Sequence, residues 1–433
     1  MANEAWKSWI HNVNWDWDRR SVLNVLYGVA QMWQNSLPDL SSLPAGLVEC
    51  LLSHTVTDHE GDEEARIRFI KFVVDTGYRD QPKIGPDGRY VLRRTTPIHL
   101  VLRTKINNWD ATATNMVQLL FEIYDRFDLN YTDEGGFTHF QAACFIPNGH
   151  QLVRKFLQNG QNPNFFVNGY SLLRSALQND TKWARELLIR GADPTCVDTD
   201  GSTSLHTICR DGRVELLQSF FEVVDYHRKP VQINVRDSLG NTPLHLAVES
   251  GNVTTFELLL ARGADPNSAN QERSTPLHLI CQRVKKDKLI ASFFKVTDEN
   301  RQTVQVNVRD RKGNTPLHLT LKNSNTWASE ILLKRGADVN SVNEEGSTPL
   351  HIICQQLQAD LLVETFLRIN DRLGKTVQIN AQDKGLNTPL HLAILHCKKK
   401  ATAILLSRGA DPNLADKDRC TAMHLELSKI HQL

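Results

Sequence analysis

The sequence predicts an all-α fold, a solenoid in which helix pairs stack on one another, and three observations predict it. The tetrapeptide Thr-Pro-Leu-His recurs along the chain. The steps between successive unit starts from Thr203 onward are 39, 33, 40, 33, 40 and 33 residues. A Gly-Ala-Asp segment closes every second unit. A segment of this size cannot bury its apolar face alone, so each unit has to pack against copies of itself.

The tetrapeptide predicts the start of the first helix in each unit. The Thr hydroxyl can accept a hydrogen bond from a backbone N–H of the first helical turn. Pro suits the first helical position because it lacks an N–H that would be unsatisfied there. Leu begins the buried face, and His at the third helical position is close enough to reach back toward the cap. The complete motif begins at Thr242, Thr275, Thr315, Thr348 and Thr388, and near matches begin at Thr96, Thr203 and Thr421.

Two weaker starts bring the number of predicted units to ten. Within 136–141 the cap would be Thr138, and Gln141 takes the position of the motif histidine. Within 169–174 the cap would be Ser171, and Arg174 takes that position. Both segments fit a degenerate form of the motif, so we expect a helix after each of them.

The second helix of each short unit is predicted to end at a glycine. Each of these glycines follows a leucine-containing helical segment and an arginine. Glycine is expected just after a helix, because the chain turns left-handed there without a steric penalty. A short unit is therefore a helix, a short turn, a second helix and an extended loop into the next cap. The four glycines are Gly191, Gly263, Gly336 and Gly409.

These residues resemble the ankyrin repeat. TPLHLA at 242–247 and GADPN at 263–267 lie in one unit at the spacing of that family, and 388–413 repeats the arrangement. The resemblance covers roughly four fifths of the chain. It implies an α-solenoid of helix-turn-helix units with β-hairpin-like loops, and a protein partner that binds the loop tips and the concave face of the first helices. In this family the asparagine that closes the loop is sometimes hydroxylated, and the matching positions are Asn267, Asn340 and Asn413.

Short units of 33 residues alternate with units of 39 or 40 residues, so the full period is 73 residues, or 72 at the first step. The long units share the wording Val-Gln-x-Asn, which begins at Val231, Val304 and Val377. Apolar residues alternate in these segments, which indicates extended, half-buried chain. We therefore predict three lengthened loops on one edge of the solenoid. A shared structural role and the duplication of a two-unit block explain the repeated Val-Gln-x-Asn motif equally well.

Two regions are expected along the chain. Residues 1–90 are predicted to form an N-terminal helical cap with degenerate repeats, and 91–433 about ten repeats, the last of them incomplete. Helices are expected near 21–33 and 65–74. After Thr421 there is room for one helix only, so the chain either ends in a short natural cap or was cut from something longer. The tryptophans at the extreme N-terminus would cover the first layer or anchor a partner; they are Trp6, Trp9, Trp15 and Trp17.

Composition indicates an intracellular protein. The formal net charge is +1, so there is no global electrostatic preference for a nucleic acid or an acidic partner. No run of about 18 apolar residues predicts a membrane span, and no signal peptide is visible, so we expect a cytoplasmic or nuclear protein without membrane insertion. Cys209, Cys281 and Cys354 recur two units apart and are expected to be buried, reduced side chains.

The sequence offers no catalytic or metal site. The motif histidines fall in different layers of the stack, whereas the ligands of one metal ion must converge on it at about 2 Å. No HExxH, Walker loop, CxxC pair or GxSxG motif is present. We therefore expect a protein that is not an enzyme and that has no cofactor and no metal.

Residues at the loop tips differ most between units, while the framework repeats. We interpret such positions as released from the constraint of folding, and they are our candidate partner-binding residues. Polar clusters also lie along the first helices, among them one at Gln282 and one at 398–400, although a charge run is usually a solvated face. The candidate residues are Asp237, Ser238, Leu239, Gln271, Glu272, Arg273, Asp310, Arg311, Lys312, Asn343, Glu344, Glu345, Asp383 and Lys384.

The function predicted from these features is a non-catalytic protein–protein interaction module: an adaptor, a scaffold or a cytosolic inhibitor. The alternative is the substrate-recognition arm of a larger enzyme assembly such as a ubiquitin ligase, with the remaining domain or partner beyond residue 433. Nucleic-acid binding through the lysine clusters would fall steeply with salt, and we do not expect it.

Overall fold

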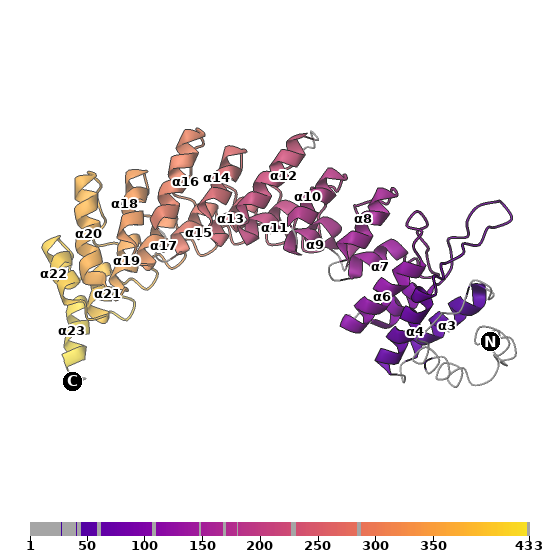
Figure 1. Cartoon of the computed structure of the whole chain (residues 1–433). Coiled ribbons are helices and arrows are strands. Elements are labelled where there is room, and N and C mark those ends of the chain that lie inside the picture. The colour runs from indigo at the N-terminus through magenta and orange to yellow at the C-terminus, as the bar shows by residue number, and fades with distance from the viewer. Residues whose placement is uncertain are drawn as a thin grey trace. The chain divides into compact units, whose positions relative to one another are not determined.

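The structure is a computed structural model that describes residues 27, 40, 45–58, 62–105, 110–146, 149–167, 170–179, 181–226, 231–283 and 287–430 (Figure 1). The chain divides into two compact parts, Met1–Asn168 (the N-terminal part) and Gly169–Leu433 (the C-terminal array). The domain boundary expected at residue 90 stays a prediction. The four N-terminal tryptophans lie outside the described residues, and so does the helix expected near 21–33 apart from residue 27.

The N-terminal part consists of packed helix pairs. α4 begins after Asp62, whose carboxylate accepts hydrogen bonds from Glu64 N and Ala65 N. The helix expected near 65–74 is confirmed, since it lies within α4 and buries Phe69. α3 packs against α4 and α5, and α6 packs against α4 and α5. The elements of this part are α3 (Ala45–Thr57), α4 (Glu63–Asp75), α5 (Pro97–Lys105), α6 (Ala111–Ile123), α7 (His139–Phe145), α8 (His150–Gln158) and β1 (Phe166–Val167).

The C-terminal array consists of two rows of helices. The first helices of the repeats pack on one another in order, and the second helices form a second row (Figure 1). Gly263 follows α14 with φ of 86°, which confirms the predicted left-handed stop. The first row is α9 (Leu172–Asn179), preceded by β2 (Tyr170–Ser171), then α11 (Ser204–Asp211), α13 (Pro243–Ser250), α15 (Pro276–Gln282), α17 (Pro316–Lys322), α19 (Pro349–Cys354), α21 (Pro389–Leu395) and α23 (Ala422–Ile430). The second row is α10 (Thr181–Ile189), α12 (Val214–Tyr226), α14 (Val253–Ala261), α16 (Asp287–Glu299), α18 (Thr326–Lys334), α20 (Ala359–Arg372) and α22 (Lys399–Ser407).

The extra residues of the long repeats lie mainly in a helix, which corrects the prediction of lengthened loops. α12 and α16 have 13 residues and α20 has 14, whereas α14, α18 and α22 have 9 each. α16 accordingly rises above its neighbours α14 and α18 (Figure 1). The Val-Gln-x-Asn segments follow these long helices and belong to no strand, yet their side chains do alternate between half-buried or buried and exposed. Periodicity identified the extended segment but missed the added helical turn before it.

Four of the second helices, α12, α14, α16 and α20, each contribute a fully buried phenylalanine to the core. Phe220, Phe256, Phe293 and Phe366 are fully buried, and the rings of Phe256 and Phe293 lie 6.3 Å apart. The recurring Cys209, Cys281 and Cys354 are buried and form no disulfide, as predicted. Burial raises the pKa of each of these three thiols above its ordinary value, because the thiolate would lose its hydration.

The motif histidine links each repeat to the next. In the Thr315 repeat, Nδ1 of His318 accepts a hydrogen bond from Thr315 N at 3.2 Å, as the predicted reach toward the cap requires. Its Nε2 lies 3.1 Å from the carbonyl oxygen of Ser347, one residue before the next cap. The same pair of contacts recurs at every complete motif and at Thr203. The sequence predicted the first contact and not the second.

The two degenerate starts replace the histidine in different ways. In the Thr138 repeat the side chain of Gln141 accepts from Thr138 N at 2.7 Å, so the reach to the cap is kept. In the Ser171 repeat, Arg174 instead reaches forward to the next tip, where its Nη1 donates to Asp198 Oδ2 at 3.0 Å and to Asp200 Oδ1 at 2.9 Å. The Asp198 carboxylate has 0% exposed surface, so this junction is a buried ion pair in place of a neutral hydrogen bond.

An asparagine ladder runs along one edge of the array, and it explains the Val-Gln-x-Asn wording. Asn307 ends such a segment, and its amide donates to Gly336 O and accepts from Asp338 N of the next repeat. Asn340, which closes the following Gly-Ala-Asp loop, makes the equivalent pair of bonds with Thr376 O and Gln378 N. Every repeat from Asn234 to Asn380 is joined to the next by one such amide. The ladder members are Asn234, Asn267, Asn307, Asn340 and Asn380.

The added turn of each long helix carries an aspartate that clamps the following short repeat. Arg335 ends α18, and its guanidinium donates two hydrogen bonds to Asp298 on α16, at 2.8 and 2.5 Å. The same guanidinium lies 4.4 Å from the ring centre of Phe294. Asp225–Arg262 and Asp371–Arg408 repeat the clamp one module to each side. A long and a short repeat therefore form one 73-residue module.

Candidate binding face

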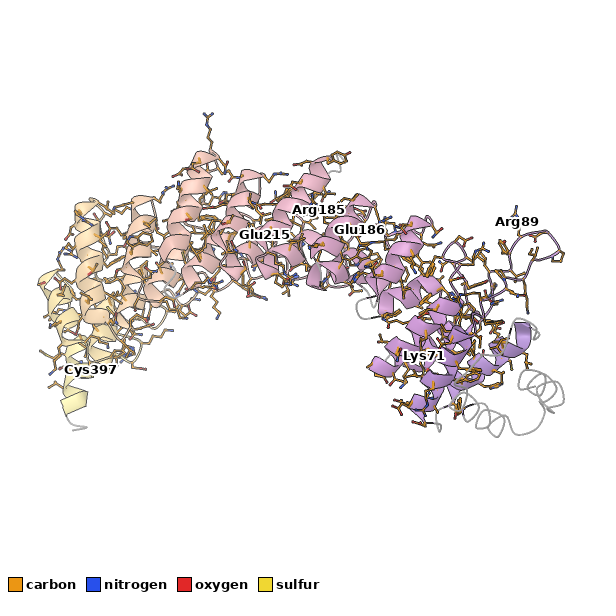
Figure 2. All side chains as sticks on the ribbon, viewed as in Figure 1. Lys71, Arg89, Arg185, Glu186, Glu215 and Cys397 are labelled. Carbon is orange, nitrogen blue, oxygen red and sulfur yellow. The ribbon has the colours of Figure 1, made fainter. Side chains whose placement is uncertain are left out.

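The loop tips and the row of first helices form one face of the C-terminal array, and the second helices form the other. Arg185 and Glu186 on α10 and Glu215 on α12 belong to the second row (Figure 2). The candidate tip residues all belong to the loops that lead into the first helices. The structure therefore places the candidates on one face, but it does not give all of them the same role.

In four of the five candidate tips, the first residue is bound to its own loop. Asp310 is only 7% exposed, and its Oδ1 accepts hydrogen bonds from Lys312 N at 2.9 Å and Asn314 N at 2.8 Å. Asp237, Asn343 and Asp383 make the same two bonds in their own tips. These four side chains hold the turn in shape, so one oxygen of each is committed to the backbone of its own loop.

The tip backbones are joined to one another. Arg311 N donates to Glu272 O at 2.8 Å, and Glu344 N donates to Lys312 O at 2.9 Å. The contact is so close that a Cβ added to Gly313 would lie 2.6 Å from Glu344 N. The interpretation that tip residues are released from the constraint of folding is therefore wrong for their main chain and for the side chains of Asp237, Asp310, Asn343 and Asp383. The side chains that remain exposed are Ser238, Leu239, Gln271, Glu272, Arg273, Arg311, Lys312, Glu344, Glu345 and Lys384.

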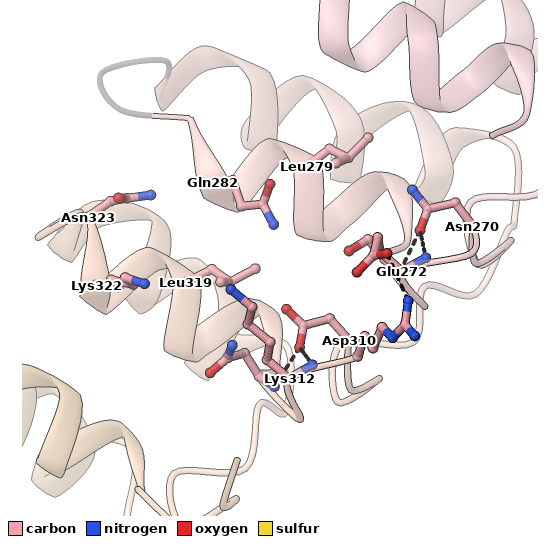
Figure 3. Close-up of a pocket in the computed structure, with 12 residues that line it drawn as sticks. Asn270, Glu272, Leu279, Gln282, Asp310, Lys312, Leu319, Lys322 and Asn323 are labelled. Atoms are coloured by element: carbon pink, nitrogen blue, oxygen red, sulfur yellow. Dashed lines mark hydrogen bonds and ion pairs between the residues drawn. The ribbon is translucent and has the colours of Figure 1, made fainter. Parts of the chain in front are cut away.

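A hollow lies on this face between the Thr275 and Thr315 repeats (Figure 3). Its volume is about 430 Å³, which is within the range of small ligand sites. Leu279 on α15 and Leu319 on α17 line its apolar part. Gln282 and Asn323 at the helix ends, and the tip residues around Asp310, supply its polar part. The hollow is large enough for one or two side chains of a partner.

The charges around the hollow are of two kinds. Glu272 and Arg311 form an ion pair at 3.2 Å across the two tips (Figure 3). Lys312 and Lys322 are both exposed, and within the described part of the chain neither makes an ion pair. The charged groups that face solvent here without a counter-charge are therefore two ammonium groups.

The histidine beneath the hollow does not add to this charge. His278 is buried, and its Nε2 contacts Asn314 O at 3.2 Å. Burial lowers its pKa below the ordinary value, although the Asp310 carboxylate opposes that shift. The ring is therefore neutral at neutral pH and adds no positive charge to that of Lys312 and Lys322.

Reasoning from the sequence found five of the twelve residues that line this hollow. It singled out Glu272, Asp310, Arg311 and Lys312 at the tips, and it noted Gln282 as part of a polar cluster. It missed Lys322, Leu279, Leu319 and Asn323. These residues lie on or just after first helices, and the sequences of those helices are so similar that no position in them was singled out. A comparison of equivalent positions 73 residues apart would have revealed Lys322, because Glu249 and Leu395 occupy its place in the neighbouring modules.

No group of three or more His, Cys, Asp or Glu side chains suited to a metal ion occurs among the residues that the structure describes. Over the same residues, no helix is both long and apolar enough to cross a membrane. The compartment expected from the composition stays a prediction.

Comparison with known proteins gives a family match over more than half of the chain. A family described as ankyrin repeats (3 copies) matches residues 172–270, 262–343 and 330–416. The human transient receptor potential cation channel subfamily A member 1 is 32% identical over 224 residues, which are 51% of this chain and 19% of the channel. The mouse B-cell lymphoma 3 protein homolog is 26% identical over 236 residues, which are 54% of this chain and 50% of the relative. This chain therefore spans between a fifth and a half of these two relatives.

Among solved structures, the ankyrin repeat domain of Bcl-3 matches with a TM-score of 0.45 and 23% sequence identity. The match covers 52% of this chain and 94% of that domain.

Proposed function

Because this chain belongs to the ankyrin-repeat family, we propose that it is a non-catalytic module that binds a partner protein on the face formed by its loop tips and first helices. Ankyrin repeats serve as protein-interaction modules, and repeat regions of this kind are typical of non-catalytic proteins. The finer role that we propose is that of an adaptor, a scaffold or an inhibitor.

The observation that supports this proposal is the separation of fixed backbone from free side chains at the tips. Hydrogen bonds between neighbouring tips hold the main chain in place, as between Arg311 N and Glu272 O. The exposed side chains are therefore presented from a rigid edge, which reduces the entropy lost when a partner binds. Because side chains there vary from repeat to repeat, the face can be specific for one partner.

A pair of variants tests the proposal. Arg311→Ala with Lys312→Ala removes two exposed tip side chains and leaves Asp310 to hold the turn. Lys295→Ala with Lys334→Ala removes two exposed side chains from the second helices of the same two repeats. Proteins captured from cell extract by the immobilised full chain and identified by mass spectrometry should be lost with the tip variant and kept with the second-row variant. The opposite pattern would place the interface on the second helices.

A second role, the recognition arm of a larger enzyme assembly, is supported by one finding. The matched segment makes up 19% of the length of the human channel and 50% of the length of the mouse B-cell lymphoma 3 protein homolog. Such arrays therefore occur within longer proteins. Co-purification of a ubiquitin-transferring activity with the full chain, and modification of the captured partner, are expected for this role. An inert complex would exclude it in favour of the adaptor.

A further inference from the structure

The lysine pair at the hollow between the Thr275 and Thr315 repeats is not part of the repeated framework. One module earlier, the places of Lys312 and Lys322 are taken by Leu239 and Glu249. One module later they are taken by a glycine and a leucine, at 385 and 395. The framework therefore folds without these lysines, and stability does not explain their presence.

The acidic residue opposite them does belong to the framework. Glu272 has Asp200 and Glu345 as its equivalents in the neighbouring modules. Asp200 forms an ion pair with Arg174, and Glu272 forms an ion pair with Arg311. Glu272 is therefore already neutralised by a cation, which leaves the two lysine ammonium groups without a carboxylate of their own.

The rest of the hollow restricts what can be bound there. Leu279 and Leu319 offer an apolar surface, while the exposed Gln282 amide can donate to and accept from a peptide backbone. The carboxylates of Glu272 and Asp310 lie in the same hollow, so a densely charged polyanion such as a nucleic acid would be repelled by them. A single carboxylate carries one negative charge, which the two lysine ammonium groups can compensate, and an apolar side chain beside it can contact the two leucines.

Resting on the proposed function, we propose that this hollow binds an extended acidic segment of the partner protein, in which an aspartate or glutamate lies beside an apolar residue. The apolar side chain packs on Leu279 and Leu319. The carboxylate lies between Lys312 and Lys322 and forms charge-assisted hydrogen bonds with their ammonium groups. The Glu272–Arg311 pair closes the side of the hollow toward the preceding tip.

Synthetic peptides test the charge of this segment. Three fluorescent peptides share one flexible sequence with two central leucines, and each has an amidated C-terminus. They differ only in the two residues between the leucines, which are Glu in the first peptide, Gln in the second and Lys in the third. The full chain should bind the Glu peptide at least about tenfold more tightly than the Gln peptide in fluorescence polarisation, and the difference should shrink as salt is raised. A fourth arm, the Gln peptide with a free C-terminus, shows whether a terminal carboxylate is an equivalent source.

Charge-swap variants assign the binding to the hollow. Lys312→Glu with Lys322→Glu should abolish the preference for the Glu peptide and create one for the Lys peptide. Lys295→Glu with Lys334→Glu changes the net charge equally on the second helices of the same repeats and should leave the preference intact. If the two double variants behave alike, or if the Glu and Gln peptides bind equally, the proposal is overturned.

A neutral variant separates this proposal from the proposed function. Gln282→Trp fills the hollow without changing any charge. Capture of the partner that is lost with Gln282→Trp but kept with the lysine charge reversal would support partner binding on this face and reject the acidic segment. Capture that neither variant changes would reject the acidic segment, and together with silent tip variants it would reject the proposed binding face. Far-UV circular dichroism of each variant confirms that it is folded.

Discussion

The motif histidine explains much of the cohesion between neighbouring repeats. In His318, Nδ1 accepts the N–H of Thr315, so the single proton of a neutral ring is on Nε2, where it is donated to the carbonyl of Ser347. A second proton on Nδ1 would point at the N–H that this atom accepts. Geometry and burial therefore both require the neutral ring.

Replacing His318 by alanine should destabilise the array by about 3 kcal/mol, because two hydrogen bonds and a buried ring are lost. Urea denaturation followed by circular dichroism measures the change. His318→Gln is the matched control, since Gln141 occupies the equivalent position in the Thr138 repeat and keeps the bond to its cap. Glutamine should retain part of the lost stability, and equal losses for the two variants would contradict this account of the cap bond.

The buried histidines should make the array less stable in acid. Burial lowers the pKa of His245 to about 4 and lowers the pKa of its equivalents, His206, His278, His318 and His351. In the unfolded chain each histidine has an ordinary pKa near 6.5, so below that pH the unfolded state binds more protons than the folded state. Stability is then present above about pH 6.5 and lost as the pH falls toward 4. The urea midpoint should fall between pH 7 and pH 5, and a constant or rising midpoint would contradict the neutral-ring assignment.

The junction at Arg174 should respond differently. The hydrogen bond from Arg174 lowers the pKa of Asp200 to about 2, so this ion pair persists where the histidine junctions lose their stability. Arg174→Ala should be severely destabilising, by about 3 to 5 kcal/mol, because it leaves the buried Asp198 carboxylate without its counter-charge. Arg174→Ala together with Asp198→Asn should recover part of the loss, which urea denaturation of both variants can measure.

At the scale of the element, the long second helices account for the alternation of repeat lengths. The added turn places Asp298 against Arg335 and lets the extended segment begin where its asparagine reaches the next loop. Exposed ion pairs of this kind contribute little, typically under 1 kcal/mol. The asparagine ladder, with two backbone bonds for each amide, is expected to contribute more.

Asn340 offers a test of the ladder. Asn340→Ala removes the bonds to Thr376 O and Gln378 N and should cost about 1 to 2 kcal/mol. Asn340→Asp is the control, since it keeps the acceptor for Gln378 N and loses only the donor to Thr376 O. The denaturation midpoint should be highest for the wild type, lower for Asn340→Asp and lowest for Asn340→Ala. If Asn340→Ala lost less stability than Asp298→Ala, the ladder would contribute less than the exposed ion pair, contrary to expectation.

At the scale of the whole molecule, the sequence predicted the two-row stack because its framework is repeated locally. Caps, prolines and glycines act within one helix end, so their positions alone determined α13, α15, α17, α19 and α21. The links between repeats could not be predicted in this way. The second hydrogen bond of His318 and both bonds of Asn340 join residues about 30 to 40 positions apart, and such partners become visible only when the repeats are stacked.

The candidate face was predicted less completely than the fold, for a related reason. Variation between repeats correctly indicated exposed side chains such as Lys312, but it could not separate them from Asp310, whose carboxylate turns inward to its own backbone. Lys322 was missed because its helix looked like every other first helix. Exposure depends on side-chain direction, which the residue type at a tip does not reveal.

Stability should vary along the C-terminal array. Helices of the first row contact the first helices of adjacent repeats and the second helix of their own repeat, so each repeat depends on the two beside it. Amide hydrogen exchange followed by mass spectrometry should show the slowest exchange in α13, α15, α17 and α19, and faster exchange in α23, whose first-row neighbour among the described residues is α21. Uniform protection from α11 to α23 would show that the array unfolds as one cooperative block.

The aspartate clamp has a consequence for how such a gene can grow or shrink. Losing the 33 codons of the Thr315 repeat would delete Arg335 and leave Asp298 facing a segment that evolved to lie elsewhere. Losing or copying 73 codons would instead leave every clamp aspartate paired with the arginine of a following short repeat. Natural variants should therefore gain or lose repeats two at a time. An insertion of an odd number of repeats should be accompanied by compensating changes at the ends of the long helices.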